Sequence, residues 1–362
     1  VTGNDGSIEL DGVNMPDVIL ESGSPLLAVS RSKLCADAER FVAAAKSAIP
    51  NSTVAYSYKT NCVPGVLRDL HRIGFFAEVI SPYELWLAEK LRVPGDRIVV
   101  NGVNKTDEYL DHAVRLNVSS INIDEAHEIE LLAQAARTHS IRARVSMRLR
   151  LDSSSHFGLD IPSGEADRVA GEIARRSDEF EFQGLHFHLL ADNDDPENHV
   201  KYQTMALDFA RQIRERHGLE TRFLNVGGGF TVPTMKVMSR AEYGLQRLLH
   251  VPCRPPDPGS GVPIEAYMQR LAKALGSYCD RYQMPVPHVV FEPGRIITSQ
   301  SHVMLTKVHA IKSNSQGPDI AMTDAGKILT SYPCDYEYHQ MFVANRMTEA
   351  PDHVYHLMGR LC

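Results

Sequence analysis

Four segments of the chain place a reactive or binding group directly after an apolar, strand-like run. Lys59 ends AYSYK, His188 ends GLHFH, the glycines Gly227–Gly229 follow FLNV, and Glu292 ends HVVFE. A lysine amine that follows a buried strand is partly desolvated, which lowers its pKa and prepares it for imine chemistry. A lone lysine at a strand end more commonly extends into solvent. The role of Lys59 therefore depends on the groups that accompany it.

Two glycine-containing turns indicate an anion site. The run Gly227–Gly229 allows backbone N–H groups to approach an anion closely, and Glu292-Pro293-Gly294-Arg295 adds a guanidinium after the next strand-like run. Phosphate sites in (β/α)8 barrels commonly use the loops after the seventh and eighth strands. Either motif alone is equally consistent with a tight turn. Together they predict a phosphate-binding corner.

The chain contains sixteen histidines, a residue type that commonly binds metal ions. His186 and His188 flank Phe187, and we expect only one of the two to face the mouth of the site, with His186 packed in the core. No HExxH motif or comparable ligand cluster occurs. We therefore predict no metal ion.

The elements that must position these groups alternate between strand and helix. Helical patterns cover 33–48, 81–91, 107–116, 124–139 and 200–218, and eight strand-like runs begin near 53, 75, 97, 119, 143, 182, 222 and 288. Such alternation implies parallel strands joined by helical crossovers, and eight units close a barrel. A doubly wound open sheet is the main rival, but no GxGxxG follows the first strands. We predict an α/β fold, a TIM-type (β/α)8 barrel.

A second, β-rich domain is expected from the two ends of the chain. After the eighth strand, HVMLTKVHAIKSN and DIAMTDAG read as short strands with turns and no long helix, and residues 1–28 read as non-helical. We predict a barrel domain over 29–292, and a β-rich domain over 1–28 and 293–362 in which the N-terminal segment pairs with the C-terminal region.

The composition of the 362 residues is that of an ordinary globular protein. With 38 Lys+Arg against 45 Asp+Glu, the formal net charge of −7 gives no sign of a nucleic-acid partner. No apolar run approaches the roughly 18 residues of a membrane helix, and VTGNDGSIEL lacks the features of a signal peptide. Six scattered cysteines without a CxxC pair favour reduced thiols. We expect a cytoplasmic location and no membrane partner.

A lysine that forms an imine, a phosphate corner and a buried carboxylate together describe a pyridoxal 5'-phosphate (PLP) site. The chain also resembles the fold-type III PLP-dependent decarboxylases, the family of diaminopimelate and ornithine decarboxylases related to alanine racemase. The matching segments follow one another in order: SPLLAVS, YSYKTN, FAEVISPYEL, NGVNKTDEYL, INIDEAHEIELL, HFGL, GLHFHL, NVGGGF, FEPGR, TDAG, PCDYEYH and GRLC.

The resemblance implies a role for each matched residue. Lys59 would carry PLP as an imine, His188 would stack on its ring, and Glu292 would bind the pyridine nitrogen. Gly228, Gly229, Gly294 and Arg295 would hold the phosphate, and Glu78 and Arg148 match positions close to the cofactor. Cys362 matches the cysteine that reaches the partner subunit's site and directs protonation, which implies a homodimer with active sites at the interface. Further strands are expected after Cys362.

Departures from the family concern the substrate. The serine of the usual H-x-G-S is replaced by Ala191, and the family lysine before FGL is His156. Diaminopimelate decarboxylases carry an arginine before the proline of P-x-x-Y, and this chain has Tyr332, which cannot make a bidentate contact with a distal carboxylate. Asp335 or Tyr336 would instead meet a basic or neutral distal group.

These observations predict decarboxylation of a basic or diamino acid: lysine, ornithine, or a carboxylated polyamine or siderophore precursor. A carboxylate at position 292 keeps the pyridine ring protonated, which favours CO2 loss, whereas the related racemases place an arginine there. Two alternatives remain open. One is a racemase or epimerase on the same fold, and the other is a non-catalytic homologue of the antizyme-inhibitor type.

Overall fold

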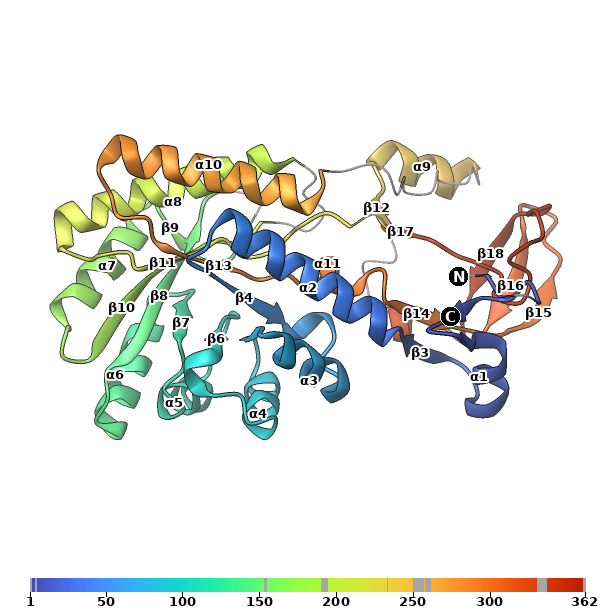
Figure 1. Cartoon of the computed structure of the whole chain (residues 1–362), viewed down its shortest axis with the longest axis horizontal. Helices are drawn as coiled ribbons and strands as arrows, with labels where there is room; N and C mark the ends of the chain where they lie inside the picture. Colours follow the sequence, from blue (N-terminus) through green and yellow to red (C-terminus); the bar gives the residue numbers. More distant parts are fainter. Residues whose placement is uncertain are drawn as a thin grey trace. The chain divides into compact units, whose positions relative to one another are not determined.

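The structure, a computed structural model (Figure 1), describes residues 2–3, 5–152, 155–189, 195–232, 234–249, 257, 262–330 and 337–360. The chain divides into two compact units. One consists of Cys35–Thr231 and Val262–Ile297, and the other of Val1–Leu34, Val232–Gly261 and Thr298–Cys362.

The first unit is a closed barrel of eight parallel strands, as predicted. Each barrel strand pairs with the next along the chain, except that β8 pairs with β10 and β11 pairs with β13, and β13 pairs with β4 to close the barrel. The short strand β9 (Leu159–Asp160) attaches to the end of β8. The barrel strands are β4 (Ser52–Ser57), β5 (Phe76–Val79), β6 (Ile98–Val100), β7 (Ser120–Ile123), β8 (Ala143–Arg150), β10 (Phe180–His186), β11 (Phe223–Asn225) and β13 (His288–Phe291).

Helices cover the outside of these strands (Figure 1). They are α3 (Pro64–Ile73), α4 (Pro82–Lys90), α5 (Asp107–Arg115), α6 (Glu128–His139), α7 (Glu165–Arg175), α8 (Pro196–His217) and α10 (Ile264–Tyr282). Local sequence sets their ends: the hydroxyls of Ser81 and Thr106 cap α4 and α5, and Gly218 ends α8 in the left-handed conformation. The chain passes from one unit to the other within two further helices, α2 (Arg31–Ala48) and α11 (Arg295–Thr298).

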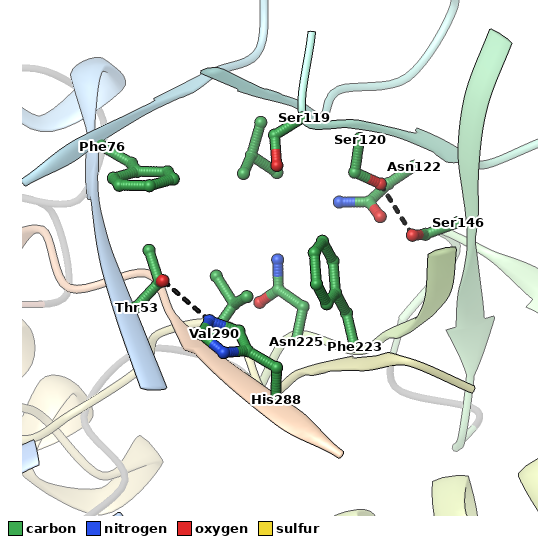
Figure 2. Close-up of a pocket in the computed structure, with 11 residues that line it drawn as sticks. Thr53, Phe76, Ser119, Ser120, Asn122, Ser146, Phe223, Asn225, His288 and Val290 are labelled. Carbon is green, nitrogen blue, oxygen red and sulfur yellow. Dashed lines mark hydrogen bonds between the residues drawn. The ribbon is translucent and has the colours of Figure 1, made fainter. Parts of the chain in front are cut away.

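The barrel interior is filled by side chains and is not an open pore. Toward the amino ends of the strands it retains a cavity of about 30 Å³, with room for one or two water molecules (Figure 2). Polar pairs line this cavity: Thr53 with His288 at 2.7 Å, and Ser120 with Ser146 at 2.7 Å. Asn225 borders the same cavity and ends β11, on the way to the opposite end of the barrel.

The second unit is rich in short strands, and the two ends of the chain meet in it. Strand β3 (Leu26–Val29) pairs antiparallel with β14 (His302–Leu305), and the Ile8 N–H donates to the Ala344 carbonyl. The N-terminal segment thus pairs with the C-terminal region within the β-rich part of the fold. The other strands are β1 (Glu9–Leu10), β2 (Val13–Asn14), β12 (Met235–Val237), β15 (Val308–Lys312), β16 (Asp319–Thr323), β17 (Glu337–His339) and β18 (Tyr355–Met358).

The expectation that residues 1–28 contain no helix is wrong. Helix α1 spans Met15–Ser22, with the Asn14 side chain accepting from the Asp17 N–H and Pro16 in the first turn. An asparagine cap followed by proline is a strong helix start, and it outweighs the β-branched residues of this segment. The unit's remaining described helices are α9 (Arg240–Leu249) and the short α12 (Lys327–Thr330).

Among the described residues, no helix combines the length and the apolar character needed to cross a bilayer.

Candidate functional site

The carboxyl ends of the barrel strands bring the predicted residues to one rim. Lys59 lies in the 3₁₀ turn Tyr58–Thr60 that follows β4, and Glu78 lies near the end of β5. Arg148 lies near the end of β8, and His188 and Glu292 follow β10 and β13. Because all eight strands run in the same direction, the closed sheet places these distant segments around one mouth.

Glu292 is fully buried, and its carboxylate is held from one side. Its Oε1 accepts hydrogen bonds from the amide nitrogens of Asn101, at 2.8 Å, and Asn225, at 2.6 Å. Its Oε2 has no hydrogen-bond partner among the described residues. A buried carboxylate needs such donors because burial without them is strongly unfavourable.

The three asparagines around this carboxylate were not predicted from the sequence. Asn101 follows β6, Asn122 lies in β7 and donates to Asn101, and Asn225 ends β11. Asn101 also donates to Glu78 Oε1 over 2.9 Å, so one amide joins two buried carboxylates. The signal in the sequence is an asparagine at or near the end of three strand-like runs, but asparagine there reads equally well as the start of a turn.

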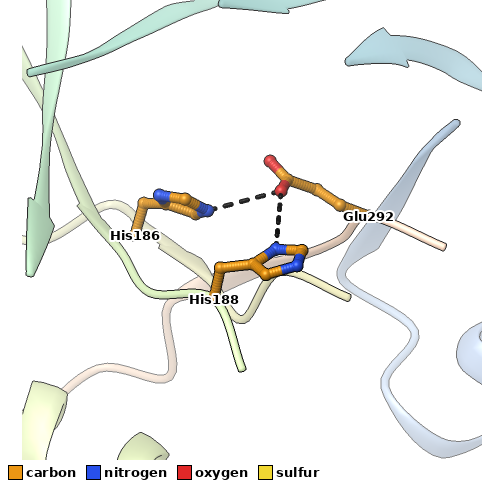
Figure 3. A group of neighbouring side chains, drawn as sticks. All are labelled: His186, His188 and Glu292. Carbon is orange, nitrogen blue, oxygen red and sulfur yellow. Dashed lines mark ion pairs between the residues drawn. The ribbon is translucent and has the colours of Figure 1, made fainter. Parts of the chain in front are cut away.

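The expectation that only one of His186 and His188 faces the mouth is wrong. Residues two apart lie on the same side of a strand, and both imidazole rings point to one oxygen of Glu292 (Figure 3). His186 Nε2 lies 3.3 Å and His188 Nδ1 lies 3.8 Å from Glu292 Oε2. His186 is therefore part of the site, beside a carboxylate.

The surroundings lower the pKa values of both Glu292 and His188, which favours an ionised carboxylate and a neutral imidazole. Burial alone would raise the pKa of Glu292, but the adjacent imidazoles of His186 and His188 outweigh burial and hold that pKa well below its usual range. Burial and the nearby Lys59 ammonium lower the pKa of His188, against the opposing pull of Glu292. The site thus presents an ionised carboxylate next to a neutral imidazole.

Lys59 stands at the exposed edge of this site. Its ammonium lies 3.9 Å from Glu78 Oε2, and its side chain is 41% exposed while that of Glu78 is completely buried. Glu78 Oε2 has no hydrogen-bond partner among the described residues. The lysine amine is therefore open to an incoming molecule and lies close to a buried carboxylate that attracts a cation.

Arg148 belongs to a chain of charged groups along the neighbouring strands. Its guanidinium lies 3.4 Å from Asp124, and the Asp124 N–H donates to Glu128 over 3.3 Å. Glu128 forms a completely buried ion pair with Lys105, with both carboxylate oxygens 2.9 Å from the ammonium. Lys105 and Glu128 were not predicted from the sequence, and the chain of contacts shows that they support the Arg148 position through Asp124.

The glycine run after β11 is packed too tightly for larger residues. Gly227 and Gly229 adopt φ values of 66° and 89°, which glycine tolerates without strain. A Cβ on Gly228 would lie 2.5 Å from the Glu292 carbonyl oxygen, and the Gly228 N–H donates to His188 Nδ1 over 3.3 Å. A Cβ on Gly294 would collide with the Thr60 hydroxyl. The two predicted turns thus form a backbone cradle beside Glu292.

Several predicted site residues fall outside the part of the chain that the structure describes. These are the substrate candidates Tyr332, Asp335 and Tyr336, the terminal Cys362, and Ala191, which takes the place of the family serine. Arg295 is described and begins α11. His156 is described and is an exposed residue of the loop between β8 and β9.

Comparisons with known proteins agree with this geometry. Residues 35–299 match the family model described as "Pyridoxal-dependent decarboxylase, pyridoxal binding domain". Diaminopimelate decarboxylase of Methanocaldococcus jannaschii is 26% identical over 377 residues, covering 99% of this chain and 80% of the relative. Diaminopimelate decarboxylase of Archaeoglobus fulgidus is 26% identical over 373 residues, covering 99% and 81%.

Solved structures show the same similarity. The crystal structure of the M. jannaschii diaminopimelate decarboxylase in complex with L-lysine has a TM-score of 0.77 and 25% identity, covering 99% of this chain and 80% of that one. A lysine/ornithine decarboxylase from Vibrio vulnificus complexed with putrescine has a TM-score of 0.68 at 21% identity, covering 88% and 77%. The latter similarity concerns the fold.

Proposed function

Because the chain belongs to the pyridoxal-dependent decarboxylase family, we propose that it removes the carboxyl group of a basic diamino acid at the rim described above. The observation that carries the proposal is the state of Glu292. It is buried, it is ionised, and its Oε2 has no hydrogen-bond partner among the described residues. A buried, ionised oxygen of this kind can accept a hydrogen bond from a protonated ring nitrogen. The pyridine nitrogen of PLP is such a group.

The remaining residues at the rim also fit the cofactor. Lys59 would hold PLP covalently through its amine, and the His188 ring would lie against the cofactor ring. The backbone at Gly228, Gly229 and Gly294, together with Arg295, would hold the phosphate. The support for this assignment is the cradle that excludes a Cβ at Gly228 and Gly294.

PLP, when bound, supplies an electron sink for the electron pair that remains after CO2 departs. The chain's own residues make that sink effective. Asn101 and Asn225 orient the ionised Glu292 through Oε1, so that Oε2 would be the oxygen that holds a proton on the ring nitrogen. The neutral His188 packs beside the site without adding a positive charge. A carboxylate at this position, in place of an arginine, favours decarboxylation over racemisation.

Lys59 and Glu78 would act on the substrate at the same rim. With PLP bound, Lys59 would be the residue whose amine the α-amino group of the substrate displaces, and its ammonium lies 3.9 Å from Glu78 Oε2. Glu78, fully buried and bonded to Asn101, holds a positive charge near the reacting atoms. Arg148, fixed by Asp124, adds a second cation at the rim.

Two substrates are supported by different observations. Tyr332, where the resemblance implies an arginine for a distal carboxylate, supports a basic amino acid such as lysine or ornithine. The similarity to proteins named diaminopimelate decarboxylase supports meso-diaminopimelate as the second candidate. We favour the basic amino acid, because a tyrosine lacks the charge that a distal carboxylate requires.

The test is CO2 release from a substrate panel by the PLP-loaded protein. L-lysine, D-lysine, L-ornithine, L-arginine, meso-diaminopimelate and carboxynorspermidine are compared at equal concentration. Release of CO2 from lysine or ornithine at least about 10-fold faster than from meso-diaminopimelate supports the favoured substrate, and the reverse order supports the second. Inversion of the α-carbon without CO2 would identify a racemase, and failure to retain PLP would identify a non-catalytic homologue.

We further propose that two copies of the chain share their active sites. The support is the resemblance of GRLC at 359–362 to the family segment whose cysteine enters the partner's site. Light scattering gives the mass, and mixing Lys59→Ala with Cys362→Ala protein gives the decisive test. If sites are shared, the mixture regains up to about one quarter of wild-type activity, because about half of its dimers are mixed and one of the two sites in each mixed dimer has both wild-type residues.

We also propose a cytoplasmic location. Cys62 and Cys279 are free thiols, and the sequence contains no CxxC pair. Free thiols are the usual state in a reducing compartment. Fractionation of the source cells, followed by detection with an antibody, tests the location.

A further inference from the structure

His186, His188 and Glu292 form a compact set of metal-ligand atoms in the candidate site (Figure 3). We propose that, in the cofactor-free protein, these three residues bind one divalent transition-metal ion of the Zn²⁺ class, and that this ion and PLP exclude one another. The three residues are called the HHE cluster below. Two imidazoles and one carboxylate are common zinc ligands, but their spacing along the chain matches no metal motif, so the sequence predicts no metal.

The spacing of the HHE cluster matches a tetrahedral zinc site. Zinc bonds of about 2.0–2.2 Å to nitrogen and oxygen place neighbouring ligand atoms roughly 3.3 Å apart. His186 Nε2 lies 3.3 Å and His188 Nδ1 lies 3.8 Å from Glu292 Oε2, and one ligand atom from each of the three residues lies within 4.8 Å of the other two. Side-chain adjustments of roughly 1 Å or less complete the geometry.

Two members of the cluster, His186 and Glu292, have buried polar atoms without a hydrogen-bond partner among the described residues. His186 is 1% exposed, and Glu292 is equally buried. Among the described residues, neither His186 nitrogen nor Glu292 Oε2 has a hydrogen-bond partner. Unsatisfied buried polar atoms cost free energy, and a metal ion relieves that cost for His186 Nε2 and Glu292 Oε2 together.

Supporting contacts hold the carboxylate in a ligand orientation. Asn101 and Asn225 both donate to Glu292 Oε1, so Oε2 is the oxygen left for a metal. One contact opposes binding: the Gly228 N–H donates to His188 Nδ1 over 3.3 Å, and the metal would have to replace it. That bond is long, and a metal–nitrogen bond more than compensates for its loss.

The HHE cluster leaves at least one coordination position for water or another ligand. Two neutral imidazoles and one carboxylate bring a charge of −1 to a dication, and imidazole ligands suit Zn²⁺ and Co²⁺. Exclusion by PLP rests on the proposed function, because there Glu292 holds the pyridine nitrogen and His188 lies against the ring. Metal binding to the cofactor-free protein does not depend on the proposed function.

The experiment uses the full chain stripped of PLP and dialysed against a chelator. Zn²⁺ binding is measured by equilibrium dialysis, and Co²⁺ binding by its visible ligand-field bands, for wild type, His186→Asn, Glu292→Gln and the control His127→Asn. His127 is an exposed histidine at the start of α6. We expect one ion per wild-type chain, an unchanged control, and affinity losses of roughly 100-fold in the other two variants.

Competition is then measured on the wild-type protein. Saturating PLP is expected to release the bound metal, and increasing Zn²⁺ is expected to raise the apparent dissociation constant of PLP in proportion to its concentration. Wild-type metal affinity in both His186→Asn and Glu292→Gln would overturn the proposal, as would a metal ion that stays bound in the PLP-loaded protein. Circular dichroism confirms that each variant is folded. Absence of any PLP binding would instead contradict the proposed function, while the metal data would still decide the site.

Discussion

The side-chain amide of Asn101 donates from one nitrogen to Glu292 Oε1, over 2.8 Å, and to Glu78 Oε1, over 2.9 Å. Two carboxylates from different strands are thereby tied to a single neutral donor in the barrel interior. Hydrogen bonds to a charged acceptor are about twice as strong as neutral ones. The amide therefore stabilises the ionised state on which the proposed chemistry depends.

Replacing Asn101 tests this relationship. In Asn101→Ala, Glu292 loses one of its two amide donors, and we expect kcat for decarboxylation to fall by roughly 10- to 100-fold, the equivalent of about 1.5–3 kcal/mol for a charged hydrogen bond. Asn122→Ala removes the hydrogen bond to Asn101 but no hydrogen bond to Glu292 among the described residues, so it should have a smaller effect. Equal losses in the two variants would show that Glu292 does not depend on Asn101. Steady-state kinetics of CO2 release provide the measurement.

Lys59 is expected to be the only residue that holds PLP covalently. Lys59→Ala should lose the visible absorption band of lysine-bound PLP, and decarboxylation should fall roughly 10³-fold, because the reactive amine is gone. Borohydride reduction followed by peptide mass analysis locates the labelled lysine. Lys90→Ala, a change at an exposed lysine of α4, is the matched control and should retain the band. A band of wild-type intensity in Lys59→Ala would contradict the assignment.

A methyl group at Gly228 should weaken cofactor binding. In Gly228→Ala the new Cβ would lie 2.5 Å from the Glu292 carbonyl oxygen, so the backbone of the cradle must shift. We expect roughly 10-fold weaker PLP binding, measured by titration of the cofactor-free protein. Gly276→Ala in α10 is the control, because its Cβ meets no atom within 4 Å. That variant should bind PLP normally and be slightly more stable.

The buried ion pair of Lys105 and Glu128 predicts a non-additive stability effect. Lys105→Met leaves the Glu128 carboxylate buried without its counter-ion and should destabilise the protein by about 3–5 kcal/mol. The double variant Lys105→Met/Glu128→Gln removes the charge and retains an acceptor for the Asp124 N–H, so it should recover most of that loss. Urea unfolding of both variants measures the difference. Additive losses would contradict the coupling.

His199 predicts a pH-dependent stability. Burial lowers the pKa of His199 to about 3, and its Nδ1 lies 2.5 Å from the Tyr267 hydroxyl oxygen. The histidine of the unfolded chain takes up a proton near pH 6.5 and that of the folded chain does not, so stability falls as the pH drops from about 6.5 toward 3.

The expected contribution between pH 7.5 and pH 4 is about 3 kcal/mol. His199→Phe removes this titration, so its free energy of unfolding should fall less over that range than that of the wild type. The change in free energy between the two pH values is the quantity to compare, because a phenylalanine ring cannot bond to the Tyr267 hydroxyl at either pH. Identical pH dependence in the two proteins would rule out His199 as the source.

The main architecture and the principal rim residues were predictable because both depend on local patterns. β-Branched runs and helical periodicity located all eight barrel strands, and a closed parallel barrel brings strand ends together by topology alone. Lys59, His188 and Glu292 therefore fell at one mouth. Helix α1 also has a local signal, the cap formed by Asn14 with Pro16 in the first turn, although the β-branched residues of this segment favour a strand.

Relationships between distant segments depended on the folded chain. Asn101 and Glu292 lie 191 residues apart in sequence, and asparagine at a strand end is compatible with many roles. The expectation that only one of His186 and His188 faces the mouth places His186 in the core, but its ring turns toward Glu292 at 3.3 Å. The sequence by itself determined which chemical groups lie at the rim, since strand direction follows from the order of elements. Only the tertiary structure decided which atoms meet there, because hydrogen bonds and ion pairs act over a few ångströms, and barrel closure sets those distances.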